Sequence, residues 1–291
     1  MGADYFPNVI LTTQDGKQVR FYDDLLKGKS VAINVIYTNC TDECPLETAR
    51  MSEVQRLLGP RMGRDIRFYS ISIDPEHDTP EVLKAYAKKF GVGPGWLFLT
   101  GKKEDIVMLT KKLGLSRSSD LANRDGHASS LMLGNEATGQ WMRNSAVDNP
   151  RFLTASINTF FGWPDLAAAP SYAQARPVDM NQAQTLFQSR CAACHTVGGG
   201  DKIGPDLQGV VQRRDPAWLS RFIQEPDKVL AEGDATATGL FRQYKQVRMP
   251  NLRLGEEEVA SLVSYLDASV KAPVPAVAAD VPASGHAHHK H

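Results

Sequence analysis

The spacing of apolar residues divides the 291-residue chain into two parts. Up to about residue 162, β-branched runs alternate with segments of helical spacing, and the runs over residues 31–37 and 67–73 are apolar enough to be central strands. Further strands are predicted over residues 9–13, 18–22, 97–100, 130–133 and 140–143, and helices over residues 46–58, 80–90 and 104–113. This alternation predicts an α/β domain, a central sheet with helices on both faces.

Beyond this part the spacing is helical and predicts a small all-α domain. The predicted helices cover residues 181–190, 216–224 and 256–268. Two Ala/Pro-rich segments show neither the helix period nor the strand period of apolar residues. The first, over residues 163–177, is predicted to be a linker, and the second, over residues 271–291, is predicted to be a disordered tail that ends in histidines. The predicted organisation is a first domain over residues 1–162 and a second domain over residues 178–270, joined by the linker.

Composition excludes some classes of function. Lys+Arg and Asp+Glu both number 33, so the formal net charge is zero and nothing indicates nucleic acid or an anionic membrane as a partner. The longest apolar run is far shorter than the roughly 18 residues of a membrane span, so no span is expected. The four cysteines form two close pairs, Cys40/Cys44 and Cys191/Cys194, which indicates metal, redox or haem chemistry rather than a disulfide scaffold.

The second cysteine pair belongs to the sequence Cys191-Ala192-Ala193-Cys194-His195, a c-type haem attachment pattern. Two thiols at this spacing can meet the two vinyl groups of one porphyrin, and the adjacent histidine is then directed at the iron. A zinc half-site and a thioredoxin-like pair are the alternatives, but zinc needs two more ligands, and this half has no further Cys or His before the tail. The pattern predicts one covalent haem c.

Covalent haem is normally attached outside the cytoplasm, which predicts an exported, periplasmic protein. The first residues of the sequence carry neither the basic nor the apolar region of a signal peptide. We therefore expect that the sequence begins after a removed leader. Whether the precursor also has a membrane anchor is not decided by the sequence.

The second iron ligand is inferred by elimination. From the linker onward the sequence has two methionines, and Met180 precedes the attachment site on the proximal side. Met249 can close over the other haem face, and a methionine of the plain core is the alternative. A His/Met pair raises the reduction potential of the iron and leaves no open position for substrate, so we expect an electron-transfer haem with His195 and Met249 as axial ligands.

The second part resembles the small monohaem class I cytochromes c, over about residues 178–270. The resemblance rests on the attachment sequence, on IGPDL at residues 203–207 and on MPNL at residues 249–252. It implies that the carbonyl of Pro205 accepts a hydrogen bond from His195 and fixes the orientation of the ring.

The first cysteine pair lies in CTDECP (residues 40–45), which follows a predicted strand and opens the next helix. Positions i and i+4 of a helix share a face, so both sulfurs can point at one partner. The helix N-terminus favours thiolates, which suit Cu(I), and the same pair can close as a redox disulfide. Two buried small residues without further function are the alternative.

The first part has two histidines, which we interpret differently. His127 precedes the predicted strand over residues 130–133 and can lie in a loop at the edge of the sheet, where it completes a site of two thiolates and one imidazole. His77 lies in a loop in which Asp78 or Thr79 can cap the following helix, and we expect it to be exposed to solvent. The predicted copper ligands are Cys40, Cys44 and His127.

These residues together resemble the SCO/SenC family of thioredoxin-fold copper proteins, over about residues 5–162. The motifs are CTDECP at residues 40–45, DPEHDTP at 74–80, WLFLTG at 96–101 and the loop of His127. The resemblance implies a thioredoxin-like fold, one copper ion bound by the two cysteines and the histidine, and a role in building the copper centre of respiratory oxidases. Glu43 departs from the family, where this position is usually apolar, and its charge disfavours thiolates.

Three functions remain open. The first is an exported copper-binding assembly factor whose client is an oxidase subunit and whose haem exchanges single electrons with the copper or dithiol site. The second is a thiol-disulfide oxidoreductase with Cys40 and Cys44 as the catalytic redox pair, and the third is an electron-transfer cytochrome with a docking domain. Electron counting disfavours reduction of the disulfide by the haem, because haem moves one electron, a disulfide needs two, and a gap of about 0.3 V costs roughly 14 kcal/mol. Two uses of the haem remain: exchange of one electron with copper, which we prefer, and acceptance of electrons one at a time as the dithiol is oxidised.

Overall fold

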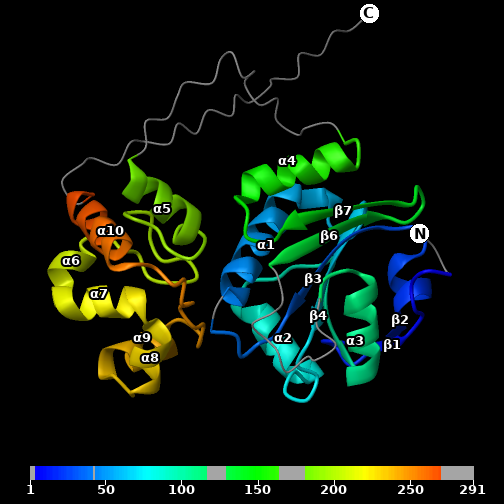
Figure 1. Cartoon of the computed structure of the whole chain (residues 1–291), viewed down its shortest axis with the longest axis horizontal. Coiled ribbons are helices and arrows are strands. Elements are labelled where there is room, and N and C mark those ends of the chain that lie inside the picture. The colour runs from blue at the N-terminus through cyan, green and yellow to red at the C-terminus, as the bar shows by residue number, and fades with distance from the viewer. Residues whose placement is uncertain (1–3, 42, 117–128, 164–180, 270–291) are drawn as a thin grey trace, which may run out of the picture.

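Seven strands form one mixed sheet in the order β2-β1-β5-β4-β3-β6-β7 (Figure 1). The computed structural model describes residues 4–41, 43–116, 129–163 and 181–269. The strands are β1 (Ile10–Thr13), β2 (Gln18–Arg20), β3 (Ser30–Ile36), β4 (Ile66–Ser72), β5 (Trp96–Gly101), β6 (Ser130–Asn135) and β7 (Gln140–Ser145). The central strands β3, β4 and β5 are parallel, and the outer strands pair antiparallel. Parallel strands are covered on both faces, which explains the continuous apolar run of β3.

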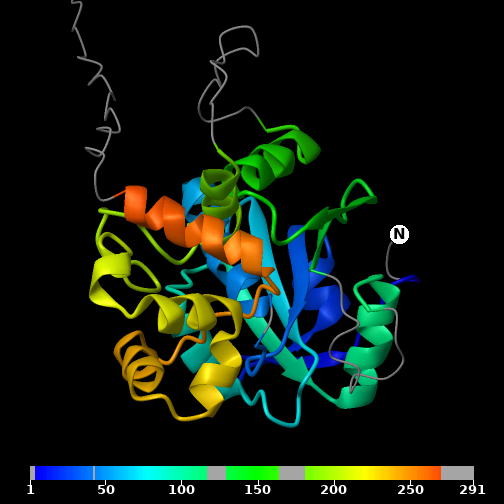
Figure 2. The same ribbon diagram turned by 60° about the vertical axis from the view of Figure 1, so that its left-hand side comes forward.

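Helices cover both faces of this sheet (Figures 1 and 2). The helices α1 (Cys44–Leu58), α2 (Pro80–Lys89) and α4 (Pro150–Phe160) pack on one face, and α3 (Lys103–Lys112) packs on the other with the π-helical segment η1 (Phe21–Leu26). Side chains of β3 alternate between the two cores: Val31, Ile33 and Val35 pack under η1 and α3, and Ala32 and Ile36 pack under α1. The predicted α/β fold class is confirmed.

Two elements of the first domain differ from the prediction. Phe21, predicted to lie in a strand, begins η1, because its ring is buried in the core and Asp24 accepts a hydrogen bond from the N–H of Arg20 at 2.7 Å. Helix α4 has no counterpart among the predicted elements. Asn149 caps it by accepting a hydrogen bond from the N–H of Arg151 at 2.9 Å, and its apolar side packs into the core shared with α1.

The second domain is built from short helices (Figure 1). They are α5 (Gln182–Arg190), α6 (Val210–Arg213), α7 (Pro216–Gln224), α8 (Pro226–Ala231), α9 (Ala235–Gln243) and α10 (Glu256–Ala268). Helix α10 packs across α5, and the rings of Phe187 and Tyr265 meet there with centroids 5.5 Å apart. The predicted helices correspond to α5, α7 and α10, whereas α6, α8 and α9 are too short or too poor in large apolar residues to give a periodic pattern.

The predicted linker beyond Trp163 and the predicted tail lie outside the described residues. None of the helices within the described ranges is both long enough and apolar enough to cross a bilayer.

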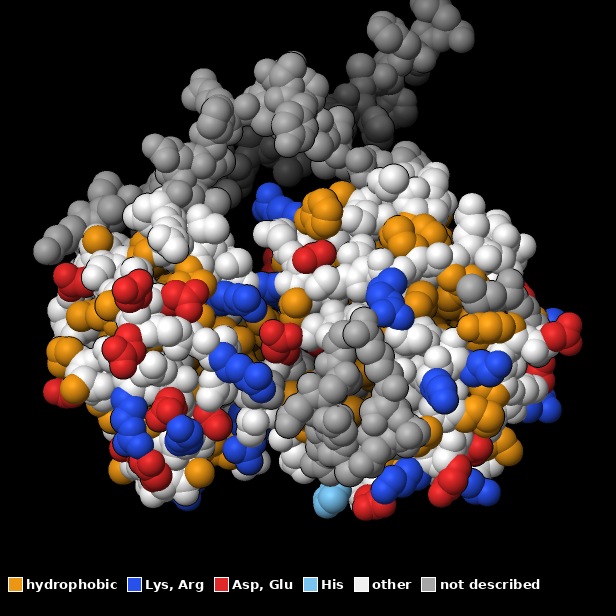
Figure 3. Space-filling view, in the orientation of Figure 1, with side chains coloured by type: hydrophobic (Ala, Val, Ile, Leu, Met, Phe, Trp, Pro, Cys, Tyr) orange, Lys and Arg blue, Asp and Glu red, His pale blue; other side chains and the backbone are white. Residues whose placement is uncertain are grey.

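The second domain lies beside α1 of the first domain (Figures 1 and 2). On the face seen in Figure 3, acidic and basic side chains are interspersed along this junction. Lys202 Nζ lies 3.4 Å from Glu53 Oε2, and Lys89 Nζ donates a hydrogen bond to the carbonyl of Gln246 at 3.3 Å. Ala193 is buried among the apolar side chains of the core under α1. The contact brings the N-terminal end of α1 to the second domain.

Candidate redox sites

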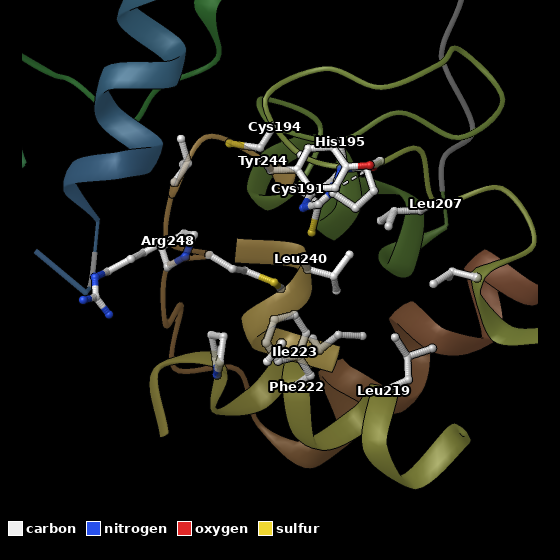
Figure 4. A pocket seen from close by; sticks show the side chains of 18 of the residues that line it. Cys191, Cys194, His195, Leu207, Leu219, Phe222, Ile223, Leu240, Tyr244 and Arg248 are labelled. Atoms are coloured by element: carbon white, nitrogen blue, oxygen red, sulfur yellow. Dashed lines mark hydrogen bonds between the residues drawn. The ribbon is translucent and has the colours of Figure 1, made fainter. Parts of the chain in front are cut away.

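The second domain encloses a cavity lined mainly by apolar side chains, called the haem cavity below. Cys191, Cys194 and His195 lie on one side of it, and side chains from α7 and α9 lie opposite (Figure 4). The opposite side is formed by Leu219, Phe222, Ile223 and Leu240. Met249, from the segment between α9 and α10, also lines the cavity. The four residues that the sequence assigns to one haem therefore surround one apolar space.

His195 is held in one orientation and one tautomer. Its Nδ1 lies 2.9 Å from the carbonyl oxygen of Pro205, and because a carbonyl only accepts, Nδ1 carries the hydrogen and Nε2 keeps the lone pair (Figure 4). Desolvation lowers the pKa of His195, which keeps the ring neutral. Gly204 makes room for the ring, because a Cβ there would lie 2.6 Å from His195 Cε1. A neutral imidazole anchored in this way suits an iron ligand.

The two thiols beside His195 stay protonated. Burial raises the pKa of Cys191 to about 12 and the pKa of Cys194 to about 11. An apolar space bounded by two thiols, a neutral imidazole and the thioether of Met249 fits a haem c held by Cys191 and Cys194. The bound haem supplies one-electron chemistry. Cys191, Cys194 and His195 would hold it, and the contact with Pro205 would keep the His195 ring in one orientation.

Cys40 and Cys44 lie together at the start of α1, inside the first domain. Their exposed fractions are 2% and 0%. Helix α1 begins at Cys44, so Cys40 precedes the helix, and its N–H donates to the carbonyl of Tyr37 at 3.3 Å. The expectation that helical spacing brings the two sulfurs together is therefore wrong. The turn before the helix brings the side chains together, and they share a hydrogen bond.

The helix N-terminus does not keep the thiol of Cys44 ionised, contrary to the expectation from sequence. The hydrogen bond with Cys40 and burial raise the pKa of Cys44 well above its ordinary value. The hydrogen bond with Cys40 and removal from water thus outweigh the favourable helix end. The thiols must release protons to bind a metal ion, and two sulfurs in contact form a soft donor pair.

A buried carboxyl group that sequence reasoning missed lies beside the pair. Glu47 is 1% exposed, burial raises its pKa to about 7, and its charge helps to raise the pKa of Cys44. Glu43 is instead half-exposed, accepts a hydrogen bond from Ser129 Oγ at 2.5 Å, and lies 3.9 Å from Arg190 of the second domain. The i, i+3 spacing of Cys44 and Glu47 in α1 is the signal that could have found this group.

His127, the predicted third copper ligand, lies outside the described residues, so its role stays a prediction. Ser129, two positions later in the sequence, contacts Glu43, which is adjacent to Cys44. Across the ranges that the structure describes, no group of three or more His, Cys, Asp or Glu residues is placed to hold a metal ion.

His77 is exposed, as predicted, with 59% of its side chain accessible. Its Nδ1 lies 2.9 Å from Asp74 Oδ1. The residue that caps the following helix is Thr79, which accepts a hydrogen bond from the N–H of Val82. The loop therefore has a structural explanation that needs no metal.

The two sites meet at the junction of the domains. Thr41, next to Cys40, and Leu46 of α1 line the haem cavity from the first domain. The N–H of Asn251, two residues after Met249, donates a hydrogen bond to the carbonyl of Thr41 at 2.8 Å. The loop that carries one thiol of the first site thus contacts the segment that carries the predicted iron ligand of the second.

Comparisons with known proteins agree with this division of the chain. Residues 5–160 match the family model described as SCO1/SenC, and residues 180–269 match the model described as Cytochrome c. Both resemblances seen in the motifs are confirmed, with the thioredoxin-like fold of the first domain and the haem c of the second.

Individual relatives cover the first domain only in part. A SCO1 protein homolog from Bacillus subtilis is 40% identical over 95 residues, which are 32% of this chain and 48% of the relative. A putative copper-binding protein from Stutzerimonas stutzeri is 36% identical over 98 residues, 33% of this chain and 46% of the relative. The chain therefore spans about half the length of these curated relatives. The solved structure of a SCO1/SenC family lipoprotein from Bacillus anthracis covers 54% of this chain and 94% of its own, with 28% identity and a TM-score of 0.44.

Proposed function

Because the chain belongs to the SCO1/SenC family and its last third is a cytochrome c domain, we propose that it is an exported copper-binding protein that helps to build the copper centre of a respiratory oxidase. Its haem exchanges single electrons with the copper-thiol site. One observation carries this proposal: Thr41, the residue after Cys40, lines the haem cavity, so the two redox sites lie next to each other.

In the proposed first site, copper is the cargo of the protein. Cys40, Cys44 and the imidazole of His127 hold it, a ligand set of two soft sulfurs and one nitrogen that suits Cu(I). Since burial and the neighbouring thiol raise the pKa of Cys44, binding releases protons, and the apparent affinity for copper rises with pH.

Electron counting supports copper rather than the dithiol as the haem's redox partner. Haem and copper each change by one electron, so one transfer balances between them. A disulfide needs two electrons, and a His/Met haem lies above typical dithiol couples, so a gap of about 0.3 V makes reduction of the disulfide cost roughly 14 kcal/mol.

The proposed compartment is the periplasm, because covalent haem is normally attached outside the cytoplasm. The proposed partners are an oxidase subunit that receives the copper and a protein that exchanges electrons with the haem. Both partners follow from the proposed function and are tested with it.

The contact between the side chains of Cys40 and Cys44 favours a second candidate, a thiol-disulfide oxidoreductase. In that function the two sulfurs exchange disulfides with a client, and the imidazole of His127 is dispensable. A docking domain for the cytochrome is the third candidate, in which neither thiol matters.

Copper titration of the haem-loaded protein separates these candidates. The proposal predicts one bound Cu(I) per chain in the wild type and in the control His77→Ala, and loss of this binding in Cys40→Ser and in His127→Ala. Disulfide exchange that survives His127→Ala would instead establish the oxidoreductase. Electron transfer by the haem that is unchanged in Cys40→Ser and in Cys44→Ser, without copper binding or disulfide exchange in the wild type, would leave only the docking role for the first domain.

A further inference from the structure

The segment between α9 and α10 contacts both redox sites. Met249 in this segment lines the haem cavity. Pro250 has no N–H, so Asn251 supplies the first backbone donor after Met249. That N–H donates to the carbonyl of Thr41 at 2.8 Å, and Thr41 is covalently joined to Cys40. One hydrogen bond therefore closes a chain of covalent bonds from the predicted copper ligand to the predicted iron ligand.

Resting on the proposed function, the geometry points to the hydrogen bond between Asn251 N–H and Thr41 C=O as the electron route between the copper-thiol site and the haem. Electronic coupling is stronger through covalent and hydrogen bonds than across van der Waals gaps of the same length. Along this route, the only non-covalent step between Cys40 and Met249 is the contact of 2.8 Å. Thr41 and Asn251 thus act as positioning residues for the transfer.

The side chain of Asn251 holds its backbone in place for this contact. Its Nδ2 donates to Asp227 Oδ1 at 2.8 Å, and its Oδ1 accepts from the N–H of Arg253 at 3.0 Å. The first bond ties the segment to α8 of the second domain, and the second closes a turn within the segment itself. The N–H of Asn251 is therefore presented to the first domain by a fixed turn.

Further polar contacts of the junction lie off this route. The ion pair of Glu43 with Arg190 joins the chain neighbours of Cys44 and Cys191, but its atoms are 3.9 Å apart, farther than the 2.8 Å between Asn251 and Thr41. The pair of Lys202 with Glu53 and the bond from Lys89 to Gln246 involve long side chains, and they do not connect to either cysteine of the first site. Surface pairs of this kind contribute little to docking. Loss of one of them should leave the electron route intact.

The step itself is balanced. One electron leaves Cu(I) held by the first domain and reduces the ferric iron of the second, which gives Cu(II) and ferrous iron. No proton, bond or further reactant is needed.

The test compares two substitutions at one position in the haem-loaded protein. Asn251→Pro removes the N–H, and the matched control Asn251→Ala keeps the N–H but loses the side-chain bond to Asp227. Cu(I) is mixed with the ferric protein, and haem reduction is followed by rapid absorption measurements. We expect the rate in Asn251→Pro to fall by about tenfold, the factor by which loss of one hydrogen bond lowers the occupancy of the contact. The rate in Asn251→Ala, which keeps the N–H and loses only the side-chain bonds that hold the turn, should fall less.

Equal rates in the wild type and in Asn251→Pro would overturn the route and leave the proposed function standing. Equal slowing in both variants would also overturn it, because the side chain rather than the N–H would then set the rate. Absence of electron transfer in every protein, both from Cu(I) to the ferric haem and from the ferrous haem to Cu(II), would instead overturn the proposed function.

Hydrogen exchange provides a second readout, which is measured on the wild type and needs neither copper nor a substituted protein. In the copper-free wild type, the amide of Asn251 should exchange slowly because it is bonded to Thr41 across the junction. Exchange as fast as that of an exposed amide would show that the contact does not persist and would overturn the route.

Discussion

The two domains depend on their redox groups in different ways. The first domain buries a complete core of its own, with Phe68, Tyr69 and Phe98 each at most 1% exposed between its sheet and its helices. In the second domain, short helices surround the apolar haem cavity, and buried side chains such as Phe187 and Leu262 form only a small cluster beside it. Haem therefore completes the core of the second domain, whereas the side chains of the first domain close its core without the proposed copper cargo.

The largest expected effect follows from removing the haem. In the double variant Cys191→Ala/Cys194→Ala, we expect the second domain to lose at least about 4 kcal/mol of stability, the contribution of a ligand present at 1,000 times its Kd, and to lose its own unfolding transition. Calorimetry and circular dichroism measure this. The matched control Cys40→Ser/Cys44→Ser should keep the covalent haem and both transitions. A second domain that unfolds cooperatively without haem would remove the contrast between the domains.

The next effect concerns the buried carboxyl group of the first domain. The pKa of Glu47 is raised by burial from 4.5 to about 7, so the folded protein keeps a proton that the unfolded chain releases. The stability that this proton provides is present below pH 4.5 and is lost as the pH rises through 7, a fall of about 3 kcal/mol.

Glu47→Gln should abolish this fall. Urea unfolding of the copper-free protein at pH 5 and pH 8 measures it through the transition of the first domain, with Glu104→Gln on the surface of α3 as the control. If the variant keeps the pH dependence of the wild type, Glu47 is not its source. If the transition of the second domain changes instead, the two cores are not independent.

A smaller effect is expected where His195 is seated. Gly204→Ala places a Cβ 2.6 Å from His195 Cε1, and relieving this overlap costs about 1–3 kcal/mol. The ring must turn, which should alter the absorption of the haem and shift its midpoint potential. Gly239→Ala in α9, where a Cβ meets no atom within 4 Å, serves as the control. An unchanged spectrum and potential in Gly204→Ala would mean that the haem, rather than the chain, orients the histidine.

The smallest effect is expected at the rim of the junction. Lys202→Ala removes the pair with Glu53, in which both side chains are partly exposed, and should weaken docking by less than about 1 kcal/mol. Amide exchange at the junction measures this, with Lys228→Ala, an exposed lysine paired within the second domain, as the control. Separation of the domains in Lys202→Ala would show that this exposed ion pair, rather than the apolar and backbone contacts, holds the two domains together.

The sequence predicts the elements whose pattern is local and strong. Apolar β3 and β4, the helix α10 and the attachment sequence around Cys191 are all visible without structure, because strand period, helix period and ligand spacing are properties of neighbouring residues. The cap at Thr79 is visible for the same reason.

What sequence reasoning misses depends on contacts between distant segments. The segment η1 forms because Phe21 enters a core made by β3 and α3, and the pKa of Cys44 is raised because the folded chain places Cys40 beside it and buries it. The burial of Glu47 and the bond between Asn251 and Thr41 likewise arise only after the chain has folded. Periodicity carries no information on such tertiary effects.

The most direct test of electron exchange between the two sites is a copper titration read at the haem. Under anaerobic conditions, Cu(I) is added to the ferric protein and, in a second sample, Cu(II) is added to the ferrous protein, while the haem absorption band is recorded. We expect one of the two additions to change the oxidation state of one haem per bound copper, and we expect this change to be lost in Cys40→Ser. Stoichiometric copper binding with no change of the haem in either sample would contradict electron exchange between the two sites.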